Sequence, residues 1–166
     1  GIYADEFNSY ELGDLMYDFT LTDIDGNELK LYELLEEKEV VILNFWYTTC
    51  SYCSLEFPYM ASAYESSYVD ESGETVYYKD KVAIIAVNPT IAGNGDTVEM
   101  MKSYRDGYGL TFNVAPDYDL DDSNLTMDPA LTLMFNVEGY PTTVVIDKFG
   151  LIAINAIKQY IKFWKN

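Results

Sequence analysis

The fold of this chain is decided by residues 41–58, which read Val41-Ile-Leu-Asn-Phe-Trp-Tyr-Thr-Thr-Cys-Ser-Tyr-Cys-Ser-Leu-Glu-Phe-Pro58. Residues 40–46 form a continuous β-branched and aromatic run, which is typical of a central strand buried on both faces. A helix is predicted from about Ser51 to Tyr64. Cys50 and Cys53 therefore stand where a buried strand gives way to a helix, and they are the only cysteines of the chain.

The spacing of Cys50 and Cys53 indicates redox chemistry. Side chains at i and i+3 of a helix share a face and lie close enough to form a disulfide. A thiol at the first helical position lies among unpaired N–H groups, which stabilise the thiolate and lower the pKa, so Cys50 is expected to attack. Cys53, one turn further in, is expected to resolve the mixed disulfide. A permanent disulfide is the alternative, although so small a loop would constrain the unfolded chain very little.

Composition excludes several classes of function. The chain has 166 residues, with 28 acidic and 10 basic side chains and a formal net charge of −18. This balance disfavours nucleic acid and anionic membrane surfaces as partners. The absence of histidine removes Ser-His-Asp and Cys-His pairs and imidazole metal sites. No run of 18 apolar residues is present, so no membrane span is expected.

The remaining sequence predicts one domain, residues 1–166, with an irregular lead-in at 1–17. Asp96 is expected to cap a helix that ends near Tyr108, and Asp128 a helix that ends near residue 135. Residues 66–81 are polar and predict either a loop or a small hairpin. The other expected elements are hairpins at 19–31 and 142–154, a short helix at 32–38, strands at 82–87 and 111–115, and a helix at 157–164. Together they predict a mixed sheet with helices on both faces.

A second informative segment is Gly139-Tyr-Pro-Thr142, immediately before an apolar strand. Proline is tolerated at the start of a strand, and an X-Pro bond readily accepts the cis form. A cis bond would offer the N–H and C=O groups of Tyr140 to an extended partner chain. A trans proline in an ordinary turn is the alternative.

Three motifs in the same order resemble one family. Residues 41–58 are similar to the active-site segment of thioredoxin-like proteins, and most similar to the ResA/TlpA type of extracytoplasmic thiol–disulfide oxidoreductase. Asp18-Phe-Thr-Leu-Thr-Asp-Ile-Asp-Gly-Asn-Glu-Leu-Lys-Leu31 resembles the N-terminal hairpin of that family, and Gly139–Gly150 resembles its cis-proline strand and closing turn. The resemblance spans roughly residues 12–154. It implies a thioredoxin fold with an N-terminal β-hairpin extension and a central insertion.

The resemblance also implies roles for single residues. Trp46 matches the aromatic residue that covers the active-site disulfide, with core packing as its other role. Pro58 matches the kink in the active-site helix, and Pro141 matches the cis-proline. Tyr140 and Thr142, which flank Pro141, are the expected substrate-binding residues.

Glu56 matches an acidic residue that ResA-type members carry three positions after the second cysteine. Asn44 occupies the place where thioredoxin has a buried aspartate that moves protons for that cysteine. Since an amide cannot titrate, Glu56 is the nearest candidate for this task, and a solvated helix residue is its alternative role. The pair Ser51-Tyr52 between the cysteines is unfamiliar in the family.

The expected function is reduction of protein disulfides through Cys50 and Cys53, without a cofactor or metal. The resemblance implies a bacterial protein outside the cytoplasmic membrane, secreted or held there by an anchor that this sequence lacks. A protein substrate, an upstream electron donor and a monomeric state are expected. The alternative function is a Cu(I)- or Zn(II)-binding module that uses the same two thiolates, although two thiolates make an incomplete site.

Three further signals carry less weight. Peroxidase activity is not expected, because Leu43 and Tyr47 replace the proline and threonine that a peroxiredoxin needs, and Arg105 is the only arginine. Residues 117–128 resemble an EF-hand loop without its glycine and glutamate, and a solvated acidic loop that caps the next helix is the favoured interpretation. The short step from Ile154 to Ile157 indicates either a trimmed loop or a segment missing near Ala156.

Overall fold

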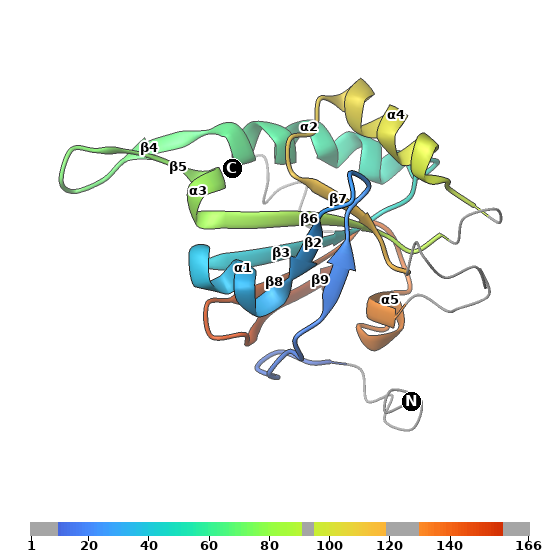
Figure 1. Ribbon diagram of the computed structural model, residues 1–166, viewed down its shortest axis with the longest axis horizontal. Helices are drawn as coiled ribbons and strands as arrows, with labels where there is room; N and C mark the ends of the chain where they lie inside the picture. The colour runs from blue at the N-terminus through green and yellow to red at the C-terminus, as the bar shows by residue number, and fades with distance from the viewer. Residues whose placement is uncertain (1–9, 91–94, 119–129, 158–166) are drawn as a thin grey trace.

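A five-stranded mixed sheet forms the centre of the molecule in the computed structural model, which describes residues 10–90, 95–118 and 130–157 (Figure 1). Its strands are β3 (Val40–Phe45), β6 (Val82–Asn88), β7 (Asn113–Pro116), β8 (Thr142–Asp147) and β9 (Ile152–Ile157), in the order β7-β6-β3-β8-β9. β3, β6 and β7 are parallel, while β8 and β9 are antiparallel to their neighbours. The predicted mixed sheet of a thioredoxin fold is confirmed.

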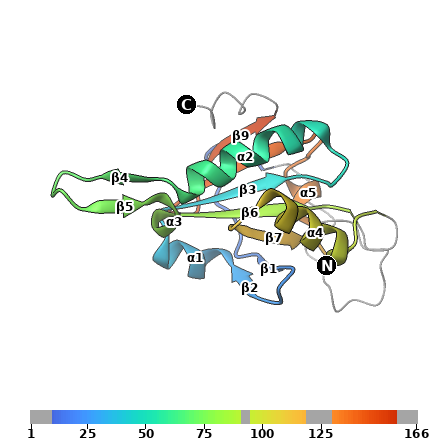
Figure 2. The same cartoon turned by 90° about the horizontal axis from the view of Figure 1, so that it is seen from above.

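Alternation of side chains along β3 divides the core into two layers. Val41, Leu43 and Phe45 face a cluster that includes α1 (Leu31–Glu37) and α5 (Ala130–Met134). Ile42, with Trp46 just beyond the strand, faces a second cluster that includes α2 (Ser51–Glu65) and α4 (Val98–Tyr108). Figure 2 looks down on the side of α2 and α4. Because β3 is buried on both faces, its end is a rigid base for the segment that follows.

The N-terminal hairpin consists of β1 (Thr20–Thr22) and β2 (Glu28–Lys30), as the sequence predicts. Its turn is built on Asp23, which is buried. Oδ1 of Asp23 accepts the backbone N–H groups of Asp25 at 2.9 Å and Asn27 at 2.8 Å. The hairpin lies over the α1 side of the sheet, where Leu21 and Leu29 enter the core.

Residues 66–81 form a hairpin rather than a loop. β4 (Ser67–Val69) pairs with β5 (Thr75–Tyr77), and α3 (Tyr78–Lys81) leads back into β6. In both ribbon views this pair of strands projects away from the sheet at the C-terminal end of α2 (Figures 1 and 2). We refer to residues 66–77 as the arm.

The prediction that Asp96 caps α4 is wrong by one residue. The N-cap is Thr97, whose Oγ1 accepts the N–H of Met100 at 3.2 Å. Aspartate and threonine are both good caps, so local sequence does not separate them. Tertiary contacts decide which residue caps the helix, because the buried carboxylate of Asp96 accepts hydrogen bonds from elsewhere in the chain, including the N–H of Thr48.

The C-terminal prediction also needs correction. A helix was expected to start at Ile157, but Ile157 is the last residue of β9 and pairs with Thr142. Strand pairing with β8 thus continues through residues 154–157 without the expected break near Ala156. The rest of that predicted helix, the Asp128 cap and residues 1–9 of the lead-in lie outside the described residues. Residues 10–17 are irregular apart from a single bridge between Leu15 and Leu151.

Candidate active site

Cys50 and Cys53 are joined by a disulfide at the start of α2, with their Cα atoms 5.3 Å apart. Cys50 is the N-cap of the helix, and its Sγ accepts the backbone N–H of Cys53 at 3.2 Å. Both residues are buried, Cys50 at 4% and Cys53 at 1% exposure. The predicted bridge is therefore present, and the sulfur of Cys50 lies where helix N–H groups can stabilise a thiolate.

Trp46 lies in the same core cluster as the disulfide and is fully buried. Its ring packs edge-to-face on Phe57 with centroids 5.3 Å apart, and it contacts Tyr104 at 4.7 Å. The hydroxyl of Tyr104 is 3.0 Å from Ser54 Oγ, and burial raises the pKa of Tyr104 to about 12. Trp46 therefore packs between α2 and α4, in the same core cluster as Cys50 and Cys53.

Glu56 is buried, with 1% exposure, so the alternative role as a solvated helix residue is wrong. Its Oε1 accepts Nδ2 of Asn44 at 2.9 Å, and the same amide lies 3.3 Å from Thr143 Oγ1. Glu56 follows Cys53 by three residues on α2, so the two side chains share a face of the helix. A carboxylate is thus held inside the protein on the same side of the helix as the second cysteine.

The loop before β8 lies beside the cysteine loop. Thr142 pairs with Phe45, so the chain just before β8 meets the chain just after β3. The Tyr140–Pro141 peptide bond is cis. The ring of Tyr140 packs edge-to-face on Tyr47, with centroids 5.2 Å apart. Burial, with smaller contributions from Asp117 and Tyr47, raises the pKa of the Tyr140 phenol.

Thr142 differs from the expected substrate contact. Its side chain is buried and donates its hydroxyl to Gly139 O at 2.6 Å, which closes the cis-proline loop on itself. Contact between Thr142 and a substrate would have to come from its backbone. The structure therefore brings Cys50, Cys53, Trp46, Glu56 and the cis-proline loop to the end of the sheet where β3 stops and β8 starts. Thr142 stabilises the cis-proline loop through its hydrogen bond to Gly139.

Sequence reasoning missed two buried carboxylates near this end of the sheet. Asp96 binds the loop before Cys50 through Thr48. Asp117 accepts the N–H groups of Leu131 and Thr132 at 3.0 and 2.7 Å and so caps α5, as expected of this acidic loop, but its side chain is buried rather than solvated. Burial raises the pKa of Asp117 to about 6, and the hydrogen bonds from Thr132 and Leu131 oppose the shift.

A shallow hollow of about 460 Å³ lies beside the loop that carries Thr48. α4 supplies the rest of its lining: Glu99, Met100, Ser103 and Tyr104. Glu99 and Met100 are exposed. The lining of the hollow therefore combines a carboxylate with apolar groups, and one of its residues, Thr48, precedes Cys50 by two positions.

Arg105 does not belong to the redox site. It forms ion pairs with Asp25 at 2.6 Å and Asp106 at 3.0 Å. A peroxiredoxin-like arrangement would need an arginine at the reactive cysteine. Within the ranges that the structure describes, no helix is long and apolar enough to cross a membrane, and no three Cys, Asp or Glu side chains form a metal-binding group.

Comparisons with known proteins agree with this geometry. The AhpC/TSA family profile matches residues 12–154. The chain is 32% identical over 145 residues to thiol-disulfide oxidoreductase ResA of Geobacillus kaustophilus, covering 87% of this chain and 68% of the relative. It is 31% identical over 135 residues to thioredoxin-like protein YneN of Bacillus subtilis, covering 81% of this chain and 65% of the relative, so it spans about two thirds of these relatives.

Solved structures match the fold. The thioredoxin domain of a thiol-disulfide oxidoreductase from Bacteroides vulgatus superimposes with a TM-score of 0.66 at 20% identity, covering 92% of this chain and 93% of that domain. At this level of identity the likeness concerns the fold alone. The sheet, the helix that starts at the cysteines and the strand after the cis-proline are thus arranged as in thioredoxin-like domains.

Proposed function

The chain belongs to the AhpC/TSA family, as a ResA/TlpA-type thioredoxin-like thiol–disulfide oxidoreductase, and on this premise we propose that it reduces disulfides in protein substrates. The observation that carries the proposal is the Cys50–Cys53 disulfide at the N-terminus of α2, beside the loop of Pro141. The metal-binding alternative has no support from the ResA relative, which is named as a thiol-disulfide oxidoreductase, and the two cysteines are bonded to each other.

In the reduced protein, the Cys50 thiolate attacks one sulfur of the substrate disulfide. A Cys50–substrate mixed disulfide forms, and the other substrate sulfur leaves as a thiolate and takes up a proton. The Cys53 thiolate then attacks Sγ of Cys50, which frees the second substrate thiolate and closes the Cys50–Cys53 bond. The substrate gains two electrons, the protein loses two, and a dithiol donor must reduce the protein again.

Glu56 is the proposed proton acceptor for Cys53. The thiol of Cys53 must lose a proton before it attacks, and both residues lie on the buried face of α2. The amide of Asn44 orients the carboxylate through its 2.9 Å hydrogen bond, although Asn44 cannot itself titrate. Trp46, which is buried in the same cluster as the two cysteines, excludes water from the disulfide on its core side. The backbone around Tyr140 and Pro141 offers hydrogen bonds to the substrate chain.

Location and partners follow from the resemblance to ResA-type proteins. We propose that the protein acts outside the cytoplasmic membrane, as a monomer, on a protein thiol or disulfide, with an upstream electron donor. No cofactor beyond the dithiol enters these steps. Hydrogen peroxide is not the proposed substrate, since Leu43 and Tyr47 stand in place of the proline and threonine that peroxidase chemistry needs, and Arg105 is paired with Asp25 and Asp106.

Reduction of insulin disulfides by dithiothreitol tests this function. The wild-type protein should accelerate insulin precipitation, and Cys50→Ser should abolish the acceleration. When pre-reduced Cys53→Ser is mixed with insulin in the absence of dithiothreitol, a mixed disulfide should accumulate that mass spectrometry detects, because no resolving thiol is left. Ser51→Ala, which lies between the cysteines without a thiol, is the control. Full activity of Cys50→Ser would refute the assignment.

A further inference from the structure

Asp96 is a buried carboxylate outside the thiol–glutamate site. It is 5% exposed and lies just before α4. Its Oδ2 accepts the backbone N–H of Thr48 at 2.7 Å and Nδ2 of Asn88 at 2.8 Å, and its Oδ1 accepts the hydroxyl of Thr48 at 2.5 Å. None of the ion pairs in the described part of the chain includes Asp96. Burial of this carboxylate is therefore balanced by hydrogen bonds alone.

The residue that Asp96 holds is close to the reacting sulfur. Thr48 precedes Cys50 by two residues, and the N–H of Cys50 donates to Tyr47 O at 3.1 Å, which makes a tight turn between β3 and α2. Cys50 ends this turn as the N-cap, and its Sγ accepts a hydrogen bond from the N–H of Cys53. The position of Thr48 therefore determines how Cys50 is presented at the end of the helix.

Asp96 is itself held by the end of β6. Its backbone N–H donates to Thr90 Oγ1 at 3.0 Å, and the N–H of Thr90 donates to Asn88 Oδ1 at 2.9 Å. Asn88 is fully buried, and its carbonyl oxygen accepts the N–H of Asp117 at 2.8 Å. The carboxylate thus connects the cysteine loop to Asn88, at the buried end of the central strand β6.

We propose that Asp96 is a positioning residue for thiol–disulfide exchange: by holding Thr48, it keeps Cys50 at the N-cap of α2, with its sulfur on the amide of Cys53. This rests on the proposed function, in which Cys50 is the attacking thiol. Asp96 acts through Thr48. Without this contact, the cysteine loop can shift away from the helix terminus, and the thiolate loses part of the stabilisation that the terminal N–H groups supply.

Thr48→Val tests the contact without changing any charge. It removes the hydroxyl donor and keeps the size of the side chain. We expect the thiol pKa of Cys50 in the reduced protein to rise by roughly 0.5 or more. The reduction potential against glutathione should become more negative, because the reduced form loses stabilisation. Thr48→Ser restores the hydroxyl and should behave as wild type. The pKa is measured from the pH dependence of alkylation by iodoacetamide.

Thr132→Val is a matched control, since the Thr132 hydroxyl also donates to a buried carboxylate, that of Asp117, at 2.7 Å. A general loss of stability would affect both variants, whereas only Thr48→Val should change Cys50. Circular dichroism establishes that each variant is folded, and Thr48→Ala replaces Thr48→Val should the latter not fold.

A double-mutant cycle assigns the effect to Asp96. In an Asp96→Asn background, adding Thr48→Val should change the Cys50 pKa by less than half of the change seen in the wild-type background. The proposal is overturned by an unchanged pKa and potential in Thr48→Val, by equal changes in Thr132→Val, or by a Thr48→Val effect that persists undiminished in Asp96→Asn. Alkylation needs no protein substrate, so the Cys50 pKa tests the Asp96–Thr48 contact separately from insulin reduction, and a failure of the proposed function is distinguishable from a failure of this inference.

Discussion

Glu56 is one of 28 acidic residues in the chain, and it is buried beside the side-chain amide of Asn44. Its partner is Asn44 on β3, whose Nδ2 donates to Oε1 of Glu56 at 2.9 Å. A helix position facing a central strand leaves little room for solvent. Glu56 is therefore buried on the same helix as Cys53, as its proposed role in accepting the proton of that thiol requires.

Glu56→Gln should slow resolution of the mixed disulfide at neutral pH by an order of magnitude or more, since positioned proton transfer contributes about 10²-fold or more. The amide keeps the shape of the side chain and an oxygen for Asn44, but it cannot accept the proton of Cys53. Stopped-flow measurement of the resolution step against pH is the readout. Glu65→Gln, on the same helix but at its exposed end, is the control, and equal rates in Glu56→Gln and wild type would contradict the role.

Asp117 makes stability depend on pH. Its pKa is about 6 in the folded protein against an ordinary value of 3.8, mainly because of burial. The folded state therefore binds this proton more readily than the unfolded state, so the contribution of Asp117 to stability rises as pH falls from 7 toward 4. Between about pH 7.5 and 5, the free energy of unfolding of wild type should gain about 1 kcal/mol relative to Asp117→Asn. Urea unfolding of both proteins measures it, and a pH-independent difference would contradict the assignment.

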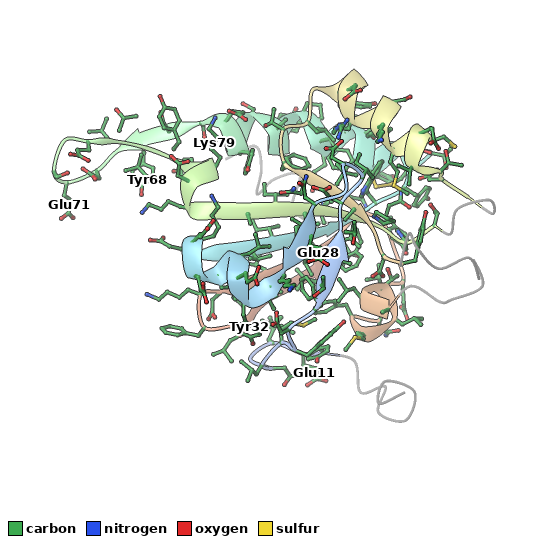
Figure 3. All side chains as sticks on the ribbon, in the orientation of Figure 1. Glu11, Glu28, Tyr32, Tyr68, Glu71 and Lys79 are labelled. Carbon is green, nitrogen blue, oxygen red and sulfur yellow. A yellow bond between two sulfur atoms is a disulfide. The ribbon has the colours of Figure 1, made fainter. Side chains whose placement is uncertain are left out.

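At the scale of elements, the arm is separable from the redox site. It starts at the C-terminal end of α2, whereas the cysteines are at the N-terminal end, about 22 Å away for a 15-residue helix. Its side chains Tyr68, Val69 and Tyr77 are exposed. Figure 3 shows Tyr68 and Glu71 on this projection, remote from the body of the sheet, with Lys79 at its base.

Replacing residues 67–77 by Asn-Gly should leave insulin reduction within about twofold of wild type and the melting temperature within a few degrees. The N–H of Tyr78 already donates to Ser66 O at 3.0 Å, so the two ends of the arm meet and a short turn can join them. The base keeps the ion pair between Lys79 and Glu65 at 2.9 Å. Insulin assays and thermal melts provide the measurement, and a large loss of activity would show that the arm contributes to the redox site.

Sequence predicted those elements whose pattern is local. The β-branched run at 40–46 and the cysteines after it were sufficient for the strand, the helix and the disulfide. The cap of α4 could not be predicted, because Asp96 and Thr97 have similar propensities and the contact with Thr48 spans 48 residues. The end of β9 was missed for the same reason: the pairing of Ile157 with Thr142 outweighs a helical pattern that only begins there.

The burial of Asp117 and Glu56 also depends on contacts that local sequence does not encode. Asp117 looks like part of a solvated acidic loop until the packing of α5 is known. For Glu56 it was the resemblance, and not the local pattern, that favoured a role at the thiols over a solvated helix position. By contrast, the resemblance correctly predicted that Trp46 and Pro141 lie at the same end of the sheet. Trp46 directly follows β3 and Pro141 directly precedes β8, and these two strands are paired.

At the scale of the molecule, the net charge of −18 should make Cys50 react faster with cationic small disulfides than with anionic ones. The lysines in described ion pairs contact Glu28, Glu33, Glu65 and Glu39, and the hollow beside Thr48 is lined by Glu99 and uncharged residues. A negative surface field raises the local concentration of cations and lowers that of anions. A cationic disulfide should therefore reach Cys50 more often than an anionic one of similar size.

Reduced protein should react with cystamine roughly tenfold faster than with dithiodiglycolate at low ionic strength. The ratio, corrected by the rates of free cysteine with each reagent, should fall toward one in about 1 M salt, where the screening length drops to about 3 Å. Glu99→Gln should lower the low-salt ratio more than Glu28→Gln, because Glu99 lines the hollow while Glu28 lies on the N-terminal hairpin. A corrected ratio near one at low salt, or one that salt leaves unchanged, would show that charge does not guide substrates to this thiol.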